Sequence, residues 1–179
     1  MKEADSILIS FLFFYGRNFR LIFNNIMNDI DYMKAALDQA QIAFSEEEIP
    51  VGAVIVKDGE IISSGRNTNR SENCPTRHAE INALEKAAEV LGNERLTGCT
   101  LYVTKEPCAM CAGAIVHSRI ERVVIGSADI KYGACGTVFD VCGNKIMNHV
   151  PEIVFGVLEE ECSELIKKFF IKLRGRDSL

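Results

Sequence analysis

The sequence lacks tryptophan, and it contains only four prolines and three histidines in 179 residues. It also lacks a hydrophobic run long enough to cross a membrane. The most apolar stretch, "ILISFLFFY" at residues 7–15, is far shorter than the roughly 20 residues that a spanning helix needs. Internal repeats and low-complexity tracts are missing too, which argues against fibrous and disordered architectures. We therefore expect no association with a membrane.

An excess of positive charge is also missing from the chain. Lysine and arginine together number 20 against 25 acidic residues, which gives a net charge of −5 at pH 7. Such a chain has no general electrostatic attraction to nucleic acid. Any contact with a polyanion therefore requires a local basic patch.

What the sequence does contain is typical of one globular domain. Hydrophobic residues make up 47% of the chain and charged residues 25%, an ordinary balance. A chain of this length suffices for a single core. The seven cysteines are an odd number and indicate no disulfide framework. Reduced thiols are typical of a cytoplasmic protein and leave the sulfurs free to bind a metal.

The first residues differ from the rest of the chain. Glu3 and Asp5 precede the apolar stretch, where a secretory signal would carry basic residues. We expect residues 1–26 to be a poorly ordered N-terminal extension, with Met27 as the natural start, and residues 27–179 to form a single domain. A signal remnant or a lipid anchor is the alternative for the extension.

Apolar periodicity and turn residues divide the chain into alternating helices and strands. Helices are expected at residues 29–44, at 78–91 with Gly92 as the end, from Pro107 to about Ser118, and at 159–173. Strands are expected at residues 51–56, 61–65, 100–104, 122–126 and 152–157, the first two joined as a hairpin by "KDGE". Strands that alternate with helices after an opening hairpin indicate an α/β protein. We predict a three-layer α/β/α sandwich with a mixed five-stranded sheet flanked by helices.

The segment "EPCAMC" at residues 106–111 places Cys108 and Cys111 three positions apart at the start of a predicted helix. Side chains at i and i+3 share one helix face, so both sulfurs can reach a single ion. We expect Pro107 in the first turn, where its missing N–H needs no partner. Thiolates at a helix N-terminus favour zinc or an iron–sulfur cluster. A redox pair and two core thiols are the alternatives.

The segment "HAE" at residues 78–80 offers the ligand that the cysteines lack. His78 opens the helix that follows the strand hairpin, and the cysteines open the helix that follows the next strand. Helix N-termini gather at the carboxyl edge of a sheet, so we expect His78, Cys108 and Cys111 to meet there. Three protein ligands leave tetrahedral zinc one position for water, which is the catalytic pattern.

Glu80 lies two residues after His78 in the same predicted turn. A carboxylate there can take a proton from zinc-activated water and return it to a substrate, although an isolated Glu at a helix start usually compensates the dipole. The combination H-x-E with P-C-x-x-C is the arrangement of zinc-dependent base deaminases. A structural zinc module, closed by Cys74 or Cys99 as a fourth ligand, is the alternative without catalysis.

Longer segments strengthen this interpretation. The chain contains "IPVGAVIV", "PTRHAEINAL", "TLYVTKEPCAMCAGAIVHSRI", "RVVIGSADIKYGACGT" and "MNH". From about Asp29 to Arg174 it resembles the bacterial tRNA-specific adenosine deaminases of the cytidine-deaminase-like superfamily. The resemblance implies conversion of the wobble adenosine of a tRNA anticodon to inosine, in a cytoplasmic homodimer with one zinc ion per subunit and no organic cofactor.

The resemblance also implies roles for particular residues. Metal ligands would be His78, Cys108 and Cys111, and the catalytic residue would be Glu80. Substrate-binding residues would be Asn67, Ile49, Pro50, Val51, Ala79 and Asp129, the last of these at the backbone of the anticodon loop. Apart from the resemblance, Asn67 is compatible with a turn residue, Val51 with strand core and Asp129 with a turn cap.

The sequence differs from the family pattern at two positions, and it ends in a basic segment. Cys74 and Arg77 stand where the family often has an acidic and a small residue; these differences leave the chemistry intact and the fine substrate preference open. The C-terminal helix offers Lys168, Lys172 and Arg174 as possible contacts to an RNA backbone, or simply as a solvated face. A free base or nucleoside, such as guanine or cytidine, is the alternative substrate for the same chemistry.

Overall fold

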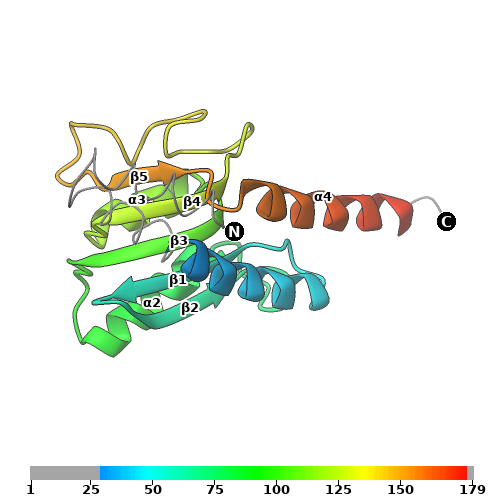
Figure 1. Cartoon of the computed structure of the whole chain (residues 1–179), viewed down its shortest axis with the longest axis horizontal. Helices are drawn as coiled ribbons and strands as arrows, with labels where there is room; N and C mark the ends of the chain where they lie inside the picture. The colour runs from blue at the N-terminus through cyan, green and yellow to red at the C-terminus, as the bar shows by residue number, and fades with distance from the viewer. Residues whose placement is uncertain (1–28, 177–179) are drawn as a thin grey trace, which may run out of the picture.

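The computed structural model describes residues 29–176, so the expectations for residues 1–26 lie outside the described residues. Figure 1 shows a sheet with helices packed against it and a C-terminal helix that extends past its edge. Within the described range, no helix has both the length and the apolar character that crossing a membrane requires.

The five predicted strands are present and form one mixed sheet. They are β1 (Gly52–Lys57), β2 (Glu60–Arg66), β3 (Cys99–Lys105), β4 (Arg122–Ser127) and β5 (Glu152–Phe155), in the order β2-β1-β3-β4-β5. Strand β1 is antiparallel to both β2 and β3, whereas β3, β4 and β5 are parallel. Two successive antiparallel pairings restore the strand direction. The carboxyl ends of β2, β3, β4 and β5 therefore share one edge of the sheet.

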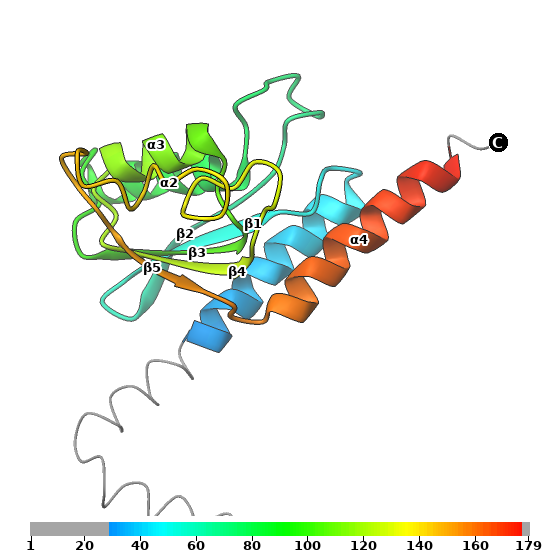
Figure 2. The ribbon, with the colours of Figure 1, turned by 90° about the horizontal axis from the view of Figure 1, so that it is seen from above.

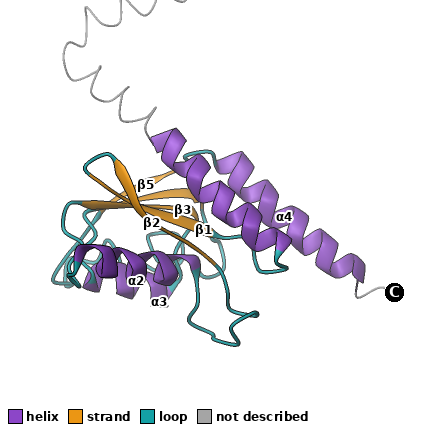
Figure 3. Cartoon of the chain, turned by 90° about the horizontal axis from the view of Figure 1, so that it is seen from below, coloured by secondary structure: helices purple, strands orange, loops and turns teal. Residues whose placement is uncertain are grey.

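Helices cover both faces of this sheet, which confirms the predicted three layers. Figures 2 and 3 show α2 (Ala79–Leu91) and α3 (Ala109–His117) on one face. The helix at residues 29–45 and α4 (Glu159–Arg176) lie side by side on the other. Side chains along β3 alternate between the two faces of the sheet and contribute to both cores. Leu101 and Val103 pack with α2 and α3, whereas Tyr102 packs with the opposite layer.

Two glycines allow helices to lie directly on strands. A Cβ at Gly52 would lie 2.1 Å from the carbonyl oxygen of Ala36. A Cβ at Gly65 would lie 2.2 Å from the carbonyl oxygen of Ala79. Any side chain at either position would push a helix away from the sheet. The contact at Gly65 matters for function because it fixes the first residue of α2.

The helix ends match the predictions in one case and differ in another. Gly92 ends α2 as predicted, with a left-handed backbone and an N–H that binds carbonyl oxygens of the last turn. The placement of Pro107 in the first turn of α3 is wrong. The carbonyl of Cys108 accepts the first helical hydrogen bond, from Ala112 at 2.8 Å, so Cys108 is the N-cap and Pro107 precedes it. The Pro107 carbonyl instead accepts the N–H of Ala134 at 2.9 Å.

Candidate active site

His78 and Cys108 occupy equivalent places in the fold. Each is the N-cap of a helix, α2 or α3, that starts at the carboxyl edge of the sheet. Both have an extended backbone, and neither side chain caps its own helix. Both side chains are therefore free of a capping role and can approach each other between the two helix starts, as the sequence predicts.

The three predicted metal ligands come together. The Nδ1 atom of His78 lies 3.7 Å from the sulfur of Cys108 and 3.5 Å from that of Cys111, and the two sulfurs are 3.8 Å apart. In a tetrahedral zinc site, two sulfurs lie roughly 3.8 Å apart, and a sulfur and a nitrogen roughly 3.6 Å. The triangle of donor atoms thus fits one tetrahedral ion without rearrangement. In the described chain these are the only residues that form such a group.

The thiols of Cys108 and Cys111 differ in pKa. The hydrogen bond with Cys111 lowers the pKa of Cys108 to about 4, and contact with His78 adds to this effect. The same hydrogen bond, together with burial, raises the pKa of Cys111. One thiolate therefore forms readily, and a divalent cation displaces the remaining proton because metals bind deprotonated sulfur.

Glu80 lies beside this group without belonging to it. It occupies the first turn of α2, and only 3% of the residue is exposed. Burial raises the pKa of its carboxyl above the ordinary value, against the opposing effects of its own backbone N–H and of His78. The side chain lines the same cavity as His78 and Cys108. It therefore lies outside the ligand group and faces the same cavity.

A cavity of about 460 Å³ opens next to the ligand group. Ile49 and Val51 form part of its wall, whereas Pro50 is buried. The N–H of Val51 binds the carbonyl of Ile49 at 2.8 Å, which closes a three-residue turn centred on Pro50. The proline therefore presents its two apolar neighbours to the cavity.

Asn67 is fixed by the start of α2. Its Oδ1 atom accepts the backbone N–H of Ala79 at 2.9 Å, and both residues are buried. Because the amide oxygen is occupied, the amide nitrogen remains to donate a hydrogen bond. Asn67 lines the cavity, and Ala79 acts by orienting it.

Asp129 also lines the cavity, on the loop after β4. Its Oδ1 atom accepts the N–H groups of Lys131 at 2.9 Å and Tyr132 at 3.3 Å, so it caps the turn. Its Oδ2 atom pairs with the ammonium of Lys105 at 2.7 Å. Burial acts to raise the pKa of Asp129, and these hydrogen bonds outweigh it and lower the pKa overall.

Several cavity residues were missed from the sequence. Two are buried carboxylates that bind backbone N–H groups, Glu48 and Glu106. Glu48 accepts from Arg70 at 2.9 Å and from Ser71 at 2.7 Å. Glu48 belongs to the acidic run "SEEE", which indicates only the end of a helix, so its place in the cavity could not be predicted. Glu106 gave a better signal, because it directly precedes the Pro-Cys pair.

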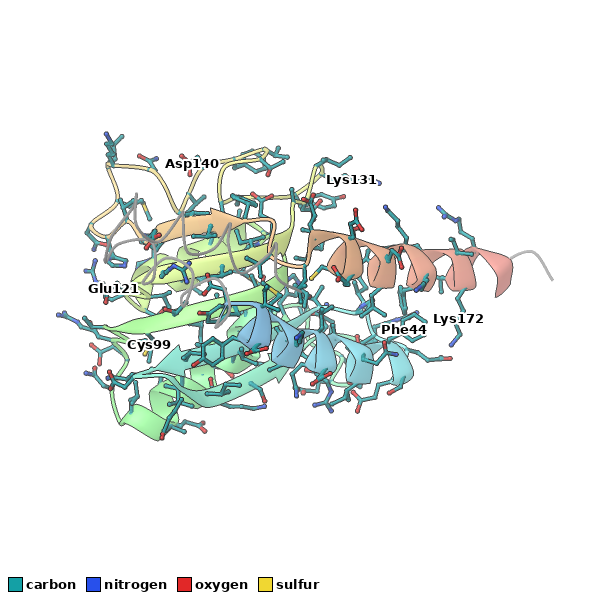
Figure 4. All side chains as sticks on the ribbon, viewed as in Figure 1. Phe44, Cys99, Glu121, Lys131, Asp140 and Lys172 are labelled. Carbon is teal, nitrogen blue, oxygen red and sulfur yellow. The ribbon has the colours of Figure 1, made fainter. Side chains whose placement is uncertain are left out.

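The residues considered as a fourth ligand lie elsewhere. Cys74 forms a hydrogen bond with Thr76 at 3.3 Å in an exposed loop. Cys99 begins β3 and therefore lies at the opposite edge of the sheet, where Figure 4 labels it near Glu121. The closed structural site is thus not formed by either residue. Arg77, the second departure from the family pattern, forms ion pairs with Glu72 and Glu85 instead of entering the cavity.

The basic C-terminal helix α4 contributes unequally to the cavity region. Phe170 lines the cavity and is 37% exposed, whereas Phe169 is buried against Phe44. Lys172 lies over the ring of Phe44 at 5.3 Å, and Figure 4 labels the two next to each other.

The other two basic candidates on α4 differ from Lys172. Lys168 pairs with Glu164 on an exposed face of the helix. Arg174 is exposed close to the end of the same helix.

Comparison with known proteins agrees with this geometry. The model of the MafB19-like deaminase family matches residues 27–174. A tRNA-specific adenosine deaminase of Bacillus subtilis is 47% identical over 145 residues, which cover 81% of this chain and 90% of that protein. One of Haemophilus influenzae is 50% identical over 147 residues, covering 82% and 85%.

A solved structure gives the same result. It comes from studies of A-to-I editing by tRNA:A34 deaminases at the wobble position of transfer RNA. It has 41% sequence identity and a TM-score of 0.73, over 75% of this chain and 98% of that one. The chain belongs to the family of tRNA-specific adenosine deaminases.

Proposed function

We propose that this protein converts adenosine to inosine at the wobble position of a tRNA anticodon. The reaction consumes one water, whose oxygen becomes the C6 carbonyl of the purine, and releases the amino group as ammonia. The observation that carries this proposal is the placement of His78, Cys108 and Cys111 around one point, with the buried carboxyl of Glu80 beside them in a cavity.

The metal that we propose for this group is zinc, one ion per chain. One imidazole and two thiolates are a donor set that zinc prefers, and the donor separations match a tetrahedral ion. When bound, zinc would lower the pKa of a water molecule at its open position.

Glu80 is the proposed proton carrier. Its carboxylate takes a proton from the attacking water, delivers it to N1 of the adenine ring and then assists the departure of ammonia. Low exposure keeps the carboxyl away from bulk water, so its proton is exchanged with the substrate. This role requires a position next to the ligands but outside their set, which is where Glu80 lies.

The remaining cavity residues are proposed to hold the target base. Ile49 and Val51 contact its faces, and Pro50 fixes the turn that presents them. Asn67 donates from its amide nitrogen to an acceptor on the base or sugar, and Ala79 keeps the amide in that orientation. The base must leave its stack to enter, which is easier in a single-stranded loop than in a duplex.

Contacts to the rest of the RNA are proposed for Lys168, Lys172 and Arg174 on α4, with Phe170 available to stack on a base. We further propose that residues 27–179 form one deaminase domain and that the enzyme is a cytoplasmic homodimer. Exposed apolar side chains after β4 support a partner subunit; they are Ile130, Phe139 and Ile146, at 82%, 56% and 91% exposure.

The test is an assay on purified, zinc-loaded protein with an anticodon stem-loop that carries adenosine at the wobble position. We expect inosine, detected by mass spectrometry after digestion to nucleosides, and no product from the same stem-loop with guanosine there. Free adenosine, cytidine and guanine serve as competing substrates. Absence of inosine, or equal turnover of a free nucleoside, contradicts the proposed substrate.

A further inference from the structure

Lys105 is the last residue of β3, three positions before Cys108, and its strand ends at the edge where the site lies. Its side chain lines the cavity that also contains His78 and Glu80, and the side chain is 26% exposed. A strand end within a sheet is a rigid position. The backbone of Lys105 is therefore fixed beside the substrate cavity by the core of the fold.

Asp129 fixes the orientation of this ammonium. One carboxylate oxygen pairs with the Nζ atom of Lys105 at 2.7 Å, and the other accepts the N–H groups of Lys131 and Tyr132. Both oxygens thus already bind groups of the protein. An ammonium has three N–H donors, so Lys105 retains donors for a ligand while paired. The group that this pair offers to an anion is the lysine.

The residues that line the cavity range from buried to exposed. Glu80 and Asn67 are 3% and 5% exposed, whereas Phe170 and Tyr132 are 37% and 67% exposed. Lys105 lies between these extremes. In a nucleotide whose base occupies the closed end, the sugar and then the phosphate lie toward the mouth. The partly exposed Lys105 is therefore suited to the phosphate of a nucleotide whose base lies beside the buried Glu80 and Asn67.

We propose that Lys105 binds a backbone phosphate next to the target nucleotide and that Asp129 is its positioning residue. This inference rests on the proposed function and deepens it, because it makes a phosphodiester strand, and not a free nucleoside, the substrate that the cavity favours. Asp129 then contributes to RNA binding by orienting the ammonium of Lys105.

The test compares wild-type protein with Lys105→Met and Lys105→Arg on the anticodon stem-loop. Loss of a charged hydrogen bond should lower kcat/KM about tenfold to a hundredfold in Lys105→Met, with kcat unchanged at saturating RNA. Lys105→Arg should restore most of it. The slope of log kcat/KM against log salt concentration is negative, and its magnitude should be smaller by about 0.7 in Lys105→Met, the value for one phosphate of a single strand.

A chemical change in the RNA separates phosphate binding from a structural role. We place one neutral methylphosphonate on either side of the target adenosine. At one of the two positions, kcat/KM of the wild-type protein should decrease by the same factor as in Lys105→Met. At that position, the methylphosphonate should not lower kcat/KM of the Lys105→Met protein any further. It should lower kcat/KM of the Asp129→Asn protein less than that of wild type. Lys86→Met is the matched control, since Lys86 binds the Ser64 carbonyl outside the cavity and should behave as wild type.

If Lys105→Met remains as sensitive to the methylphosphonate as wild type, or keeps wild-type kcat/KM and salt slope, the inference is overturned. That result leaves the proposed function intact because wild-type protein still forms inosine. Failure of wild-type protein to deaminate any stem-loop overturns the proposed function instead.

Discussion

The Oε2 atom of Glu106 accepts the backbone N–H of Asp129 at 2.9 Å. The other carboxylate oxygen accepts the N–H groups of Cys135 at 3.0 Å and Thr137 at 3.1 Å. Glu106 itself is 3% exposed and immediately precedes Pro107. One buried carboxylate therefore connects the loop after β4 to the segment that leads into α3.

Glu106→Gln should weaken this connection. A glutamine amide has one acceptor oxygen and presents N–H donors to a place where three backbone N–H groups converge, so at least one buried donor loses its partner. We expect the free energy of unfolding to decrease by about 1–3 kcal/mol, measured by chemical denaturation. KM for the stem-loop should rise because Asp129 is displaced.

The exposed Glu94 is the matched control for that substitution, because its side chain is 82% exposed. Glu94→Gln should leave stability and KM unchanged. Equal stability of the Glu106→Gln and Glu94→Gln proteins would show that the three hydrogen bonds do not organise the loop.

Glu80→Ala should separate chemistry from structure. We expect kcat to fall by about 10²-fold to 10⁴-fold, because general acid–base catalysis is lost. Metal content, measured by atomic emission, and the circular dichroism spectrum should stay as in wild type, since Glu80 is not in the ligand group. Activity that survives this change would refute the proposed proton transfers.

Gly52→Ala should disturb the layer of helices opposite the site. The new Cβ would lie 2.1 Å from the Ala36 carbonyl oxygen, so the helix at residues 29–45 must shift. We expect a loss of about 1–3 kcal/mol in unfolding free energy, which is the usual range for overpacking. Gly113→Ala is the control because nothing lies within 4 Å of its Cβ position, and it should be stabilising. Similar melting temperatures for both variants would contradict the close packing.

Cys74 should react with iodoacetamide in the metal-loaded protein, whereas Cys162 should not. The hydrogen bond with Thr76 lowers the pKa of the Cys74 thiol, and burial raises that of Cys162 to about 12. Since the thiolate is the reactive form, Cys74 reacts well below the pH at which Cys162 ionises. Peptide mass spectrometry at about pH 8 measures both, and Cys162 should be labelled only after unfolding.

The same cysteine tests the closed-site alternative. Cys74→Ser should retain one metal ion per chain, because Cys74 does not lie with His78, Cys108 and Cys111. Protection of Cys74 by metal, or loss of metal in Cys74→Ser, would restore the fourth-ligand hypothesis.

The metal-ligand group could be predicted from the sequence, and the contacts among the loops around it could not. Cys108 and Cys111 are three positions apart, so spacing alone predicts that both sulfurs reach one ion. His78 and Glu80 are two positions apart at one helix start, so the sequence places them at the same end of α2. The bond between Glu106 and Asp129 and the ion pair between Lys105 and Asp129 join residues more than 20 positions apart. Their partners depend on which loops meet at the sheet edge, and no periodicity encodes that.

The types of ligand, the helix starts that carry them, their meeting at one edge and the three layers all follow from the sequence alone. The distances between the histidine and the two cysteines, 3.7 and 3.5 Å, depend on the tertiary structure. Strand β1 is antiparallel to both of its neighbours, so β2 and β3 point the same way and deliver their following helices to one edge. The contact between Asp129 and Lys105 also depends on the tertiary structure, because the carboxylate side chain is only 11% exposed there and the nearby ammonium stabilises its charge.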